Sequence, residues 1–154
     1  MSQASGADKL DRSLGYVLKQ TATALRGSMD AVLRPLGLTL PQYACLELLE
    51  QRPDSSNADL ARGAFVTRQS MNQVLRGLQE RGLVTRPAVA AQGRALPARI
   101  TSEGRQILQT ANVEVSLVET RMLSGLTAEA QERLLGDLAA CKQALTEMQP
   151  AVQE

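Results

Sequence analysis

The chain has 154 residues, a length typical of one domain, so a second catalytic domain has no room. Hydrophobic residues make up 44% and charged residues 21%, which argues against wholesale disorder. The only aromatic residues are Tyr16, Tyr43 and Phe65, so Leu, Ala, Val and Met must build the core, and this composition favours helices. The absence of histidine excludes most hydrolase triads and histidine-based zinc sites.

The two cysteines, Cys45 and Cys141, lie far apart and in no CxxC spacing. This pattern predicts neither a zinc cluster nor a disulfide scaffold, and it is typical of a reducing compartment. The first seven residues are small and polar, and no apolar run approaches the roughly 20 residues that cross a bilayer. We therefore expect a soluble cytoplasmic protein with no membrane association, no metal and no cofactor.

The net charge is +1, but its distribution along the chain is uneven. Residues 1–54 are neutral, residues 55–105 carry a net charge of +5, and residues 106–154 carry a net charge of −4. A basic middle between a neutral and an acidic segment is typical of a polyanion-binding module flanked by assembly elements. Chance clustering of solvated arginines explains the same charges equally well.

Apolar residues at three- and four-residue steps predict a first helix over about residues 9–34, which Pro35 and Gly37 end. Thr39 and Gln42 form a capping-box pattern with Pro41 between them, so a second, mostly buried helix should run from there to residue 52.

Ser56 to Asp59 forms another N-cap pattern, which opens a brief helix that breaks at Gly63. Thr67 can cap a fourth helix, and Gly82 stands where a left-handed residue would end it. That helix has an apolar stripe at helical spacing made of Met71, Val74, Leu75 and Leu78. Two helices joined by so short a turn, residues 63–66, indicate a helix-turn-helix.

Two short extended segments, residues 83–86 and 96–100, flank a small flexible tip at residues 88–94, which predicts a β-hairpin wing. Pro87 and Pro97 cannot donate ladder hydrogen bonds, so the strands should be short. A long helix should follow from Thr101 to about residue 125, and a last one from Thr127 to residue 149. The last helix carries a heptad-like seam made of Leu134, Leu138, Cys141, Leu145 and Met148.

The fourth helix also has a polar side, which we interpret as a recognition surface for double-stranded DNA. It consists of Arg68, Gln69, Asn72, Gln73 and Arg76. Arginine pairs bidentately with guanine, and Gln or Asn with adenine, each good pair giving roughly 1–3 kcal/mol of discrimination. Thr67 and Ser70 lie near the helix N-terminus, where hydroxyls and free backbone N–H groups bind phosphates. An ordinary solvated helix face is the alternative, but the tight turn, the hairpin and the local charge all favour recognition.

Arg94 at the hairpin tip is a candidate for insertion into the minor groove, where narrow A·T tracts concentrate negative potential. Considered alone, it is equally an exposed loop arginine. Arg86 and Arg99, on the flanks of the hairpin, are expected to contact phosphates or to solubilise the wing, without base contacts.

Five motifs follow one another between residues 38 and 104. They are Leu38-Thr39-Leu40-Pro41-Gln42-Tyr43, Leu60-Ala61, Val66-Thr67-Arg68-Gln69-Ser70-Met71, Leu78-Gln79-Glu80-Arg81-Gly82-Leu83-Val84-Thr85-Arg86 and Ile100-Thr101-Ser102-Glu103-Gly104. In order and spacing they resemble the multiple-antibiotic-resistance regulator (MarR) family. The flanking helices fit the family's dimerisation arms, so the resemblance covers nearly the whole chain. It implies a mainly α winged helix-turn-helix fold with a small β-hairpin wing, in a bacterial transcription regulator.

The resemblance further implies a homodimeric repressor that binds a pseudo-palindromic operator and is released by a small aromatic or amphipathic effector. The expected parts are an N-terminal dimerisation helix (1–36), a DNA-binding domain (37–104) and C-terminal dimerisation helices (105–154). The effector would occupy the cleft between arms and wing domain, with Tyr16 and Tyr43 as possible lining residues. The family commonly has Asp-x-Arg at the wing tip, whereas this chain has Gln92-Gly93-Arg94, which implies a more mobile tip and a smaller contribution of the wing to affinity.

Three alternatives stay open from the sequence. A redox-sensing regulator would use Cys45 or Cys141, although both stand among apolar residues at helical spacing, which favours inert buried thiols. An enzyme would need an acid and a base such as Glu47 with Glu50 or Glu129 with Glu132, and these pairs lack any accompanying phosphate loop or nucleophile motif. A helical module that binds an acidic protein would have the same fold and the same basic surface as a DNA-binding regulator. Only a measurement of DNA binding distinguishes the two.

Overall fold

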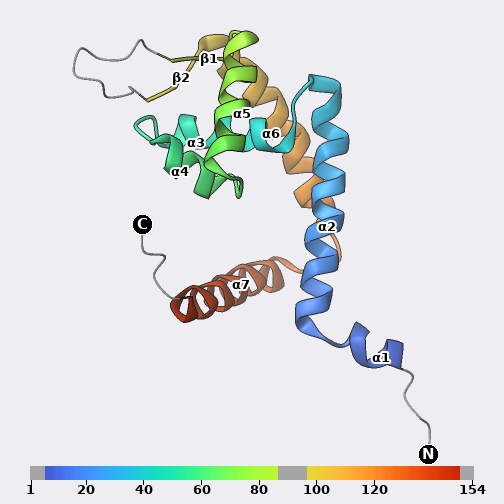
Figure 1. Ribbon diagram of the computed structural model, residues 1–154. Coiled ribbons are helices and arrows are strands. Elements are labelled where there is room, and N and C mark those ends of the chain that lie inside the picture. The colour runs from blue at the N-terminus through green and yellow to red at the C-terminus, as the bar shows by residue number, and fades with distance from the viewer. Residues whose placement is uncertain (1–5, 87–96, 150–154) are drawn as a thin grey trace, which may run out of the picture. The chain divides into compact units, whose positions relative to one another are not determined.

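The computed structural model describes residues 6–86 and 97–149. The chain forms two compact units, Met1–Val118 and Glu119–Glu154. Seven α-helices, one 3₁₀ turn and one short β-hairpin account for the regular structure of the described residues (Figure 1). The predicted mainly helical architecture with a small wing is therefore confirmed.

The first predicted helix is interrupted, which corrects the expectation of one helix over residues 9–34. The chain instead forms α1 (Gly6–Asp11) and α2 (Leu14–Leu33). Ser13 between them has an extended backbone, with φ −79° and ψ 116°, and its carbonyl oxygen accepts a hydrogen bond from the N–H of Val17 at 3.0 Å. Ser13 occupies the N-cap position of α2, a position that serine favours, although its side chain forms no capping hydrogen bond there. A 3₁₀ turn, η1 (Arg34–Leu36), and Gly37 at φ 68° then end the arm.

Helices α3 (Leu40–Gln51), α4 (Asn57–Gly63) and α5 (Arg68–Glu80) begin at the three predicted caps. The Thr39 hydroxyl accepts a hydrogen bond from the N–H of Gln42 at 3.2 Å, and the Gln42 side chain accepts one from the N–H of Thr39 at 3.0 Å. At the other end of this segment, Gly82 adopts φ 70°, the left-handed conformation that ends α5. Figure 1 shows α3, α4 and α5 grouped together, with the hairpin beside α5.

The hairpin has two residues in each strand, β1 (Val84–Thr85) and β2 (Arg99–Ile100), so the strands are shorter than the predicted segments. They are antiparallel, with Val84 opposite Ile100 and Thr85 opposite Arg99. The first pair is buried and the second exposed, as expected for alternation across a half-buried ladder. The predicted tip, residues 88–94, lies outside the described residues.

One hydrophobic core joins the helix-turn-helix, the base of the hairpin and the start of α6 (Ser102–Met122). Its buried members are Leu33, Leu38, Cys45, Leu46, Leu49, Leu60, Ala61, Met71, Leu75, Leu78, Leu83, Val84, Ala98, Ile100, Leu108 and Ala111. Thr101 fixes the start of α6, because its hydroxyl donates to the Gly82 carbonyl at 2.7 Å and accepts from the N–H of Gly104 at 3.0 Å. This core provides a rigid base for α5.

The second unit contains the end of α6 and helix α7 (Ala128–Met148), which begins at the predicted cap Thr127. The Thr127 hydroxyl accepts a hydrogen bond from the N–H of Ala130 at 3.2 Å. The Gln131 amide closes the turn before α7 by donating to the carbonyls of Leu123 and Leu126, at 3.3 and 3.1 Å. No side chain of α7 is buried within this single chain.

Candidate nucleic-acid interface

Helix α5 separates its apolar and polar side chains onto two faces, as the sequence predicts. Met71, Leu75 and Leu78 are buried in the core. All five polar residues of the predicted recognition surface are exposed, namely Arg68, Gln69, Asn72, Gln73 and Arg76. The structure thus brings these side chains together on one side of a firmly packed helix, while their contacts with bases stay a prediction.

The two hydroxyls at the start of α5 are engaged with each other. Thr67 Oγ1 accepts a hydrogen bond from the backbone N–H of Ser70 at 3.0 Å and lies 3.0 Å from Ser70 Oγ, where a second hydrogen bond joins the two hydroxyls. Thr67 remains exposed and Ser70 is half-buried. The arrangement fixes the N-terminal turn of the helix, and phosphate binding by these two residues stays a prediction.

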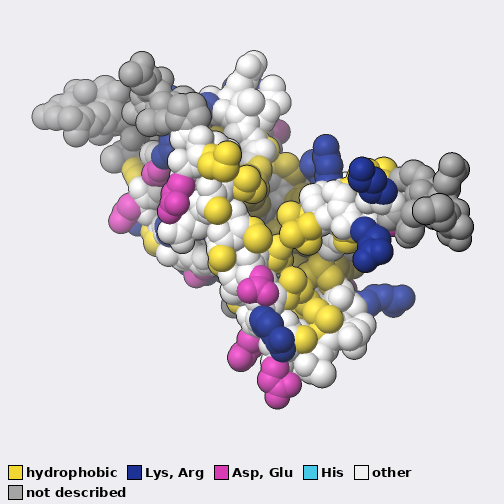
Figure 2. All heavy atoms as spheres, turned by 90° about the horizontal axis from the view of Figure 1, so that it is seen from below, with side chains coloured by type: hydrophobic (Ala, Val, Ile, Leu, Met, Phe, Trp, Pro, Cys, Tyr) yellow, Lys and Arg dark blue, Asp and Glu magenta, His cyan; other side chains and the backbone are white. Residues whose placement is uncertain are grey.

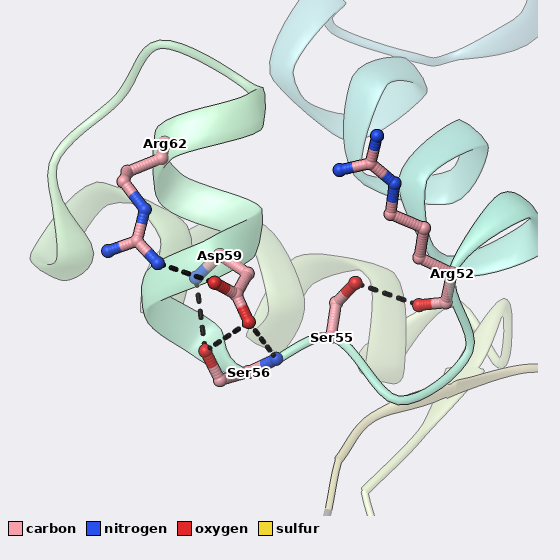
Figure 3. Close-up of polar contacts among 5 residues, drawn as sticks. All are labelled: Arg52, Ser55, Ser56, Asp59 and Arg62. Carbon is pink, nitrogen blue, oxygen red and sulfur yellow. Dashed lines mark hydrogen bonds and ion pairs between the residues drawn. The ribbon is translucent and has the colours of Figure 1, made fainter.

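Helix α4 is held by a capping box in which Ser56 and Asp59 exchange hydrogen bonds (Figure 3). The Asp59 carboxylate also pairs with the Arg62 guanidinium. The hydrogen bonds from Ser56, above all from its side chain, and the contact with Arg62 lower the pKa of Asp59. The carboxylate therefore stays ionised and keeps the start of α4 in place.

The turn between α4 and α5 is tight and includes an unusual backbone conformation. Phe65 adopts φ 58°, and its side chain is 95% exposed. The N–H of Val66 donates to the Ala61 carbonyl at 3.0 Å, which closes the turn against α4. The predicted helix-turn-helix is therefore present, but no local signal marked the non-glycine residue with positive φ.

A side-chain hydrogen bond that the sequence did not predict links the two helices of the motif. The Asn57 amide Nδ2 donates to Oδ1 of Asn72 on the exposed face of α5. The Oδ1 atom of Asn57 is buried and has no hydrogen-bond partner among the described residues. One member of the predicted recognition surface is thus held by a residue of the preceding helix.

Arg81 anchors the other end of α5, also without a sequence signal. Its guanidinium donates to the Gly37 carbonyl at 2.6 Å and to the Leu36 carbonyl at 3.2 Å. Both carbonyls belong to the turn between α2 and α3, so the end of α5 is tied to the end of the N-terminal arm.

The wing is described only at its base. Arg86, directly after β1, and Arg99, in β2, are exposed, and phosphate contacts by these two residues stay a prediction. The predicted minor-groove residue, Arg94, lies outside the described residues, as does the departure from the family pattern at residues 92 and 93.

Large apolar side chains are exposed along the helices outside the helix-turn-helix (Figure 2). They include Leu14 (72%) on α2 and Leu135 (73%) on α7, and all members of the predicted seam on α7 are exposed as well. The expected burial of Cys141 on that seam is therefore wrong for the single chain, in which its side chain is exposed. Burial of Cys45 is confirmed, and burial raises the pKa of its thiol to about 12.

A cavity of about 290 Å³ lies between α2, α3 and the turn before α5. It is lined by Arg26, Met29, Leu40, Pro41, Tyr43, Ala44, Ala64, Phe65 and Val66. The Tyr43 hydroxyl donates to Oδ1 of Asn112 on α6 at 2.7 Å. Tyr43 thus lines a cavity with mostly apolar walls and one cation, whereas Tyr16 lies at a separate hollow on α2.

Two of the four carboxylates considered as catalytic groups, Glu47 and Glu50, have structural partners. Glu47 accepts a hydrogen bond from Gln51 at 2.7 Å, and Glu50 pairs with Arg105 at 2.9 Å. Among the residues that the structure describes, no group of three or more His, Cys, Asp or Glu side chains is placed to hold a metal ion. Within residues 6–86 and 97–149, no helix has both the length and the apolarity needed to span a bilayer.

Comparisons with known proteins agree with this geometry. The model of the MarR family matches residues 36–95. The HTH-type transcriptional repressor Rv2887 of Mycobacterium tuberculosis is 47% identical over 121 residues, which cover 79% of this chain and 87% of the relative. The solved structure of Rv2887 in complex with DNA is 42% identical, with a TM-score of 0.72, and covers 85% of this chain and 98% of that chain. The solved complex of Rv2887 with salicylic acid is 44% identical, with a TM-score of 0.71, and covers 85% and 97%. The chain therefore belongs to the MarR family.

Proposed function

We propose that this protein is a transcriptional repressor that binds a pseudo-palindromic DNA operator as a homodimer. The observation that carries the proposal is the exposed polar face of α5, presented on a helix whose opposite face is fixed in the core. The similarity to Rv2887, a repressor that has been solved in complex with DNA, supports the same conclusion. In this proposal α5 enters the major groove of each half-site.

Each residue of the α5 face has a role that its chemistry fits. Arg68 and Arg76 pair with guanine edges, and Gln69 and Gln73 pair with adenine edges, while the hydroxyl of Thr67 contacts a phosphate. Ser70 and Asn72 complete the interface, and Arg94 reaches the minor groove. The net charge of +5 over residues 55–105 supports this assignment, because arginines that neutralise phosphates release counterions.

The homodimer is formed by residues 1–36 and 105–154. Their exposed apolar side chains support this assignment, because contiguous apolar surface on a soluble protein marks an interface. A two-fold axis would place two copies of α5 roughly 34–36 Å apart, which matches successive major grooves on one side of the duplex. The acidic segment 106–154 then contributes to assembly and not to DNA contacts.

The effector is a small aromatic acid that occupies the cavity beside Tyr43. The cavity has mostly apolar walls for a ring and the Arg26 guanidinium for a carboxylate. The complex of Rv2887 with salicylic acid supports this ligand class. Because Phe65 and Val66 line the cavity directly before α5, an occupant there would contact the segment that positions the recognition helix.

Selection of bound duplexes from a random DNA pool tests the proposal, and we expect an inverted repeat bound by a dimer. Gln73→Ala should lower the discrimination at one base pair of each half-site by roughly 1–3 kcal/mol. Gln79→Ala is the matched control, because Gln79 is exposed at the C-terminal end of the same helix, beyond the five residues of the recognition surface. A monomer, or binding without sequence preference at physiological salt, would refute the proposal and would favour a module that grips an acidic protein.

Release by the effector is measured on the selected operator with sodium salicylate. We expect salicylate to weaken operator binding by the wild-type protein, and Arg26→Ala to require more salicylate while binding the operator normally. If Arg26→Ala responds like the wild type, the effector does not use this cavity.

A further inference from the structure

The hydrogen bond between Asn57 and Asn72 joins an inner helix to the DNA-facing surface. Asn57 is the first residue of α4 and is half-buried, whereas Asn72 is exposed on α5. The Asn57 Nδ2 group donates, and Asn72 Oδ1 accepts. The donor and acceptor ends of the Asn72 amide are therefore not equivalent: the oxygen faces the protein, and the Nδ2 group makes no hydrogen bond with the described residues.

The buried Oδ1 of Asn57 indicates that this residue is not there for stability. That oxygen has no partner among the described residues, although buried polar atoms are nearly always hydrogen-bonded. An unpartnered buried oxygen disfavours the folded state, and such sites often serve function. Its amide nitrogen donates to Asn72 and to no other described residue, so orienting Asn72 is the role that the geometry leaves for Asn57.

The orientation of Asn72 decides which base edge it fits. A bidentate pair with adenine needs the asparagine oxygen to accept from N6 while its nitrogen donates to N7. In this structure Asn57 occupies one lone pair of that oxygen and holds it toward α4, so the opposite end of the amide, the Nδ2 group with its two N–H donors, is the end directed away from α4. Donors fit the acceptor atoms O6 and N7 of guanine or O4 of thymine.

We propose that Asn57 is a positioning residue that turns Asn72 to read a guanine or thymine edge instead of adenine. This inference rests on the proposed function, since it names the base that one residue of the recognition surface selects. It replaces the general pairing of asparagine with adenine at this position.

The test uses the selected operator with all four bases placed at the position where Asn72→Ala abolishes discrimination. The wild type should favour guanine or thymine there by about ten-fold over adenine and cytosine. Asn57→Asp carries only acceptors, so it should draw the Asn72 Nδ2 group inward and expose Oδ1. The order of preference should then reverse toward adenine or cytosine, whose N6 and N4 groups donate. Ratios between bases are compared, because the added negative charge weakens binding to every sequence alike.

Asn57→Leu supplies a second variant that forms no hydrogen bond. We expect it to lose most of the preference at this one position, to keep the preferences at other positions, and to unfold at a temperature no lower than the wild type. A wild type that favours adenine there, or an Asn57→Leu protein with unchanged base ratios, would overturn the inference while leaving the proposed function intact. A wild type without any sequence preference would instead overturn the proposed function itself.

Discussion

Gly104 lies in the first turn of α6, where the helix passes against the base of the hairpin. A Cβ atom at this position would stand 2.2 Å from the Leu83 carbonyl oxygen and 2.8 Å from Ile100 Cγ1. The oxygen belongs to the backbone beside β1, so it cannot rotate away as a side chain can. Gly104→Ala must therefore separate α6 from the hairpin.

The size of the effect follows from two opposing contributions. Forcing a methyl group into packed space typically destabilises a protein by about 1–3 kcal/mol. The better helix propensity of alanine offsets at most about 1 kcal/mol of this loss. Because the 2.2 Å contact is with a backbone oxygen, the upper end of the first range applies, and we expect the free energy of unfolding to fall by about 2 kcal/mol. Urea denaturation followed by circular dichroism, at one fixed protein concentration, measures it.

Gly63→Ala provides the comparison for this measurement. Its Cβ atom would meet Leu48 Cδ1 at 2.7 Å, but that atom is the end of a flexible side chain. A smaller loss of stability is expected there than at Gly104. If Gly104→Ala is as stable as the wild type, or if Gly63→Ala loses more, the packing argument is wrong.

Three further predictions concern individual side chains. Thr67→Ala removes the hydroxyl that accepts from the N–H of Ser70 and should lower the free energy of unfolding by about 1 kcal/mol, whereas Thr67→Ser should restore it in urea denaturation. Because burial raises the pKa of Cys45 to about 12, we expect iodoacetamide to label this thiol at pH 8 only after unfolding, and rapid labelling of the folded protein, read by mass spectrometry, would contradict this. The lowered pKa of Asp59 means that its stabilising effect is present above the ordinary aspartate pKa of about 3.9 and is lost as the pH falls through the lower folded-state value. Asp59→Asn should therefore flatten the acid side of a curve of stability against pH, and an unchanged curve would show that the capping box does not contribute to acid sensitivity.

The helix starts were predictable because their determinants are local. Thr39, Ser56 and Thr67 each accept a hydrogen bond from a backbone N–H three residues later, which a short window of sequence reveals. The left-handed Gly82 is equally local. Ser13 belongs to the same residue class, but the continuous apolar period around it concealed the break between α1 and α2.

The contacts that orient α5 were not predictable, since each joins residues far apart in the chain. Asn57 and Asn72 are separated by 15 positions, and Arg81 and Gly37 by 44. The periodicity of apolar residues does not predict such pairs, because each pair forms only where two helices or a helix and a turn pack against each other. The seam on α7 was predictable, because its period correctly places the apolar side chains on one face of the helix. The period does not reveal what packs against that face. Burial of Cys141 was therefore inferred, whereas its side chain is exposed in the single chain.

The guanidinium of Arg81 has a mechanical consequence. It donates hydrogen bonds to two carbonyl oxygens in the turn between α2 and α3, so this turn and the end of α5 are held together. A helix that is fixed to a neighbouring turn by two hydrogen bonds follows the movement of that turn, whereas a helix joined to it only by a flexible linker does not. Any tilt of α2 relative to α3 is therefore passed to α5 instead of being lost in the intervening turn.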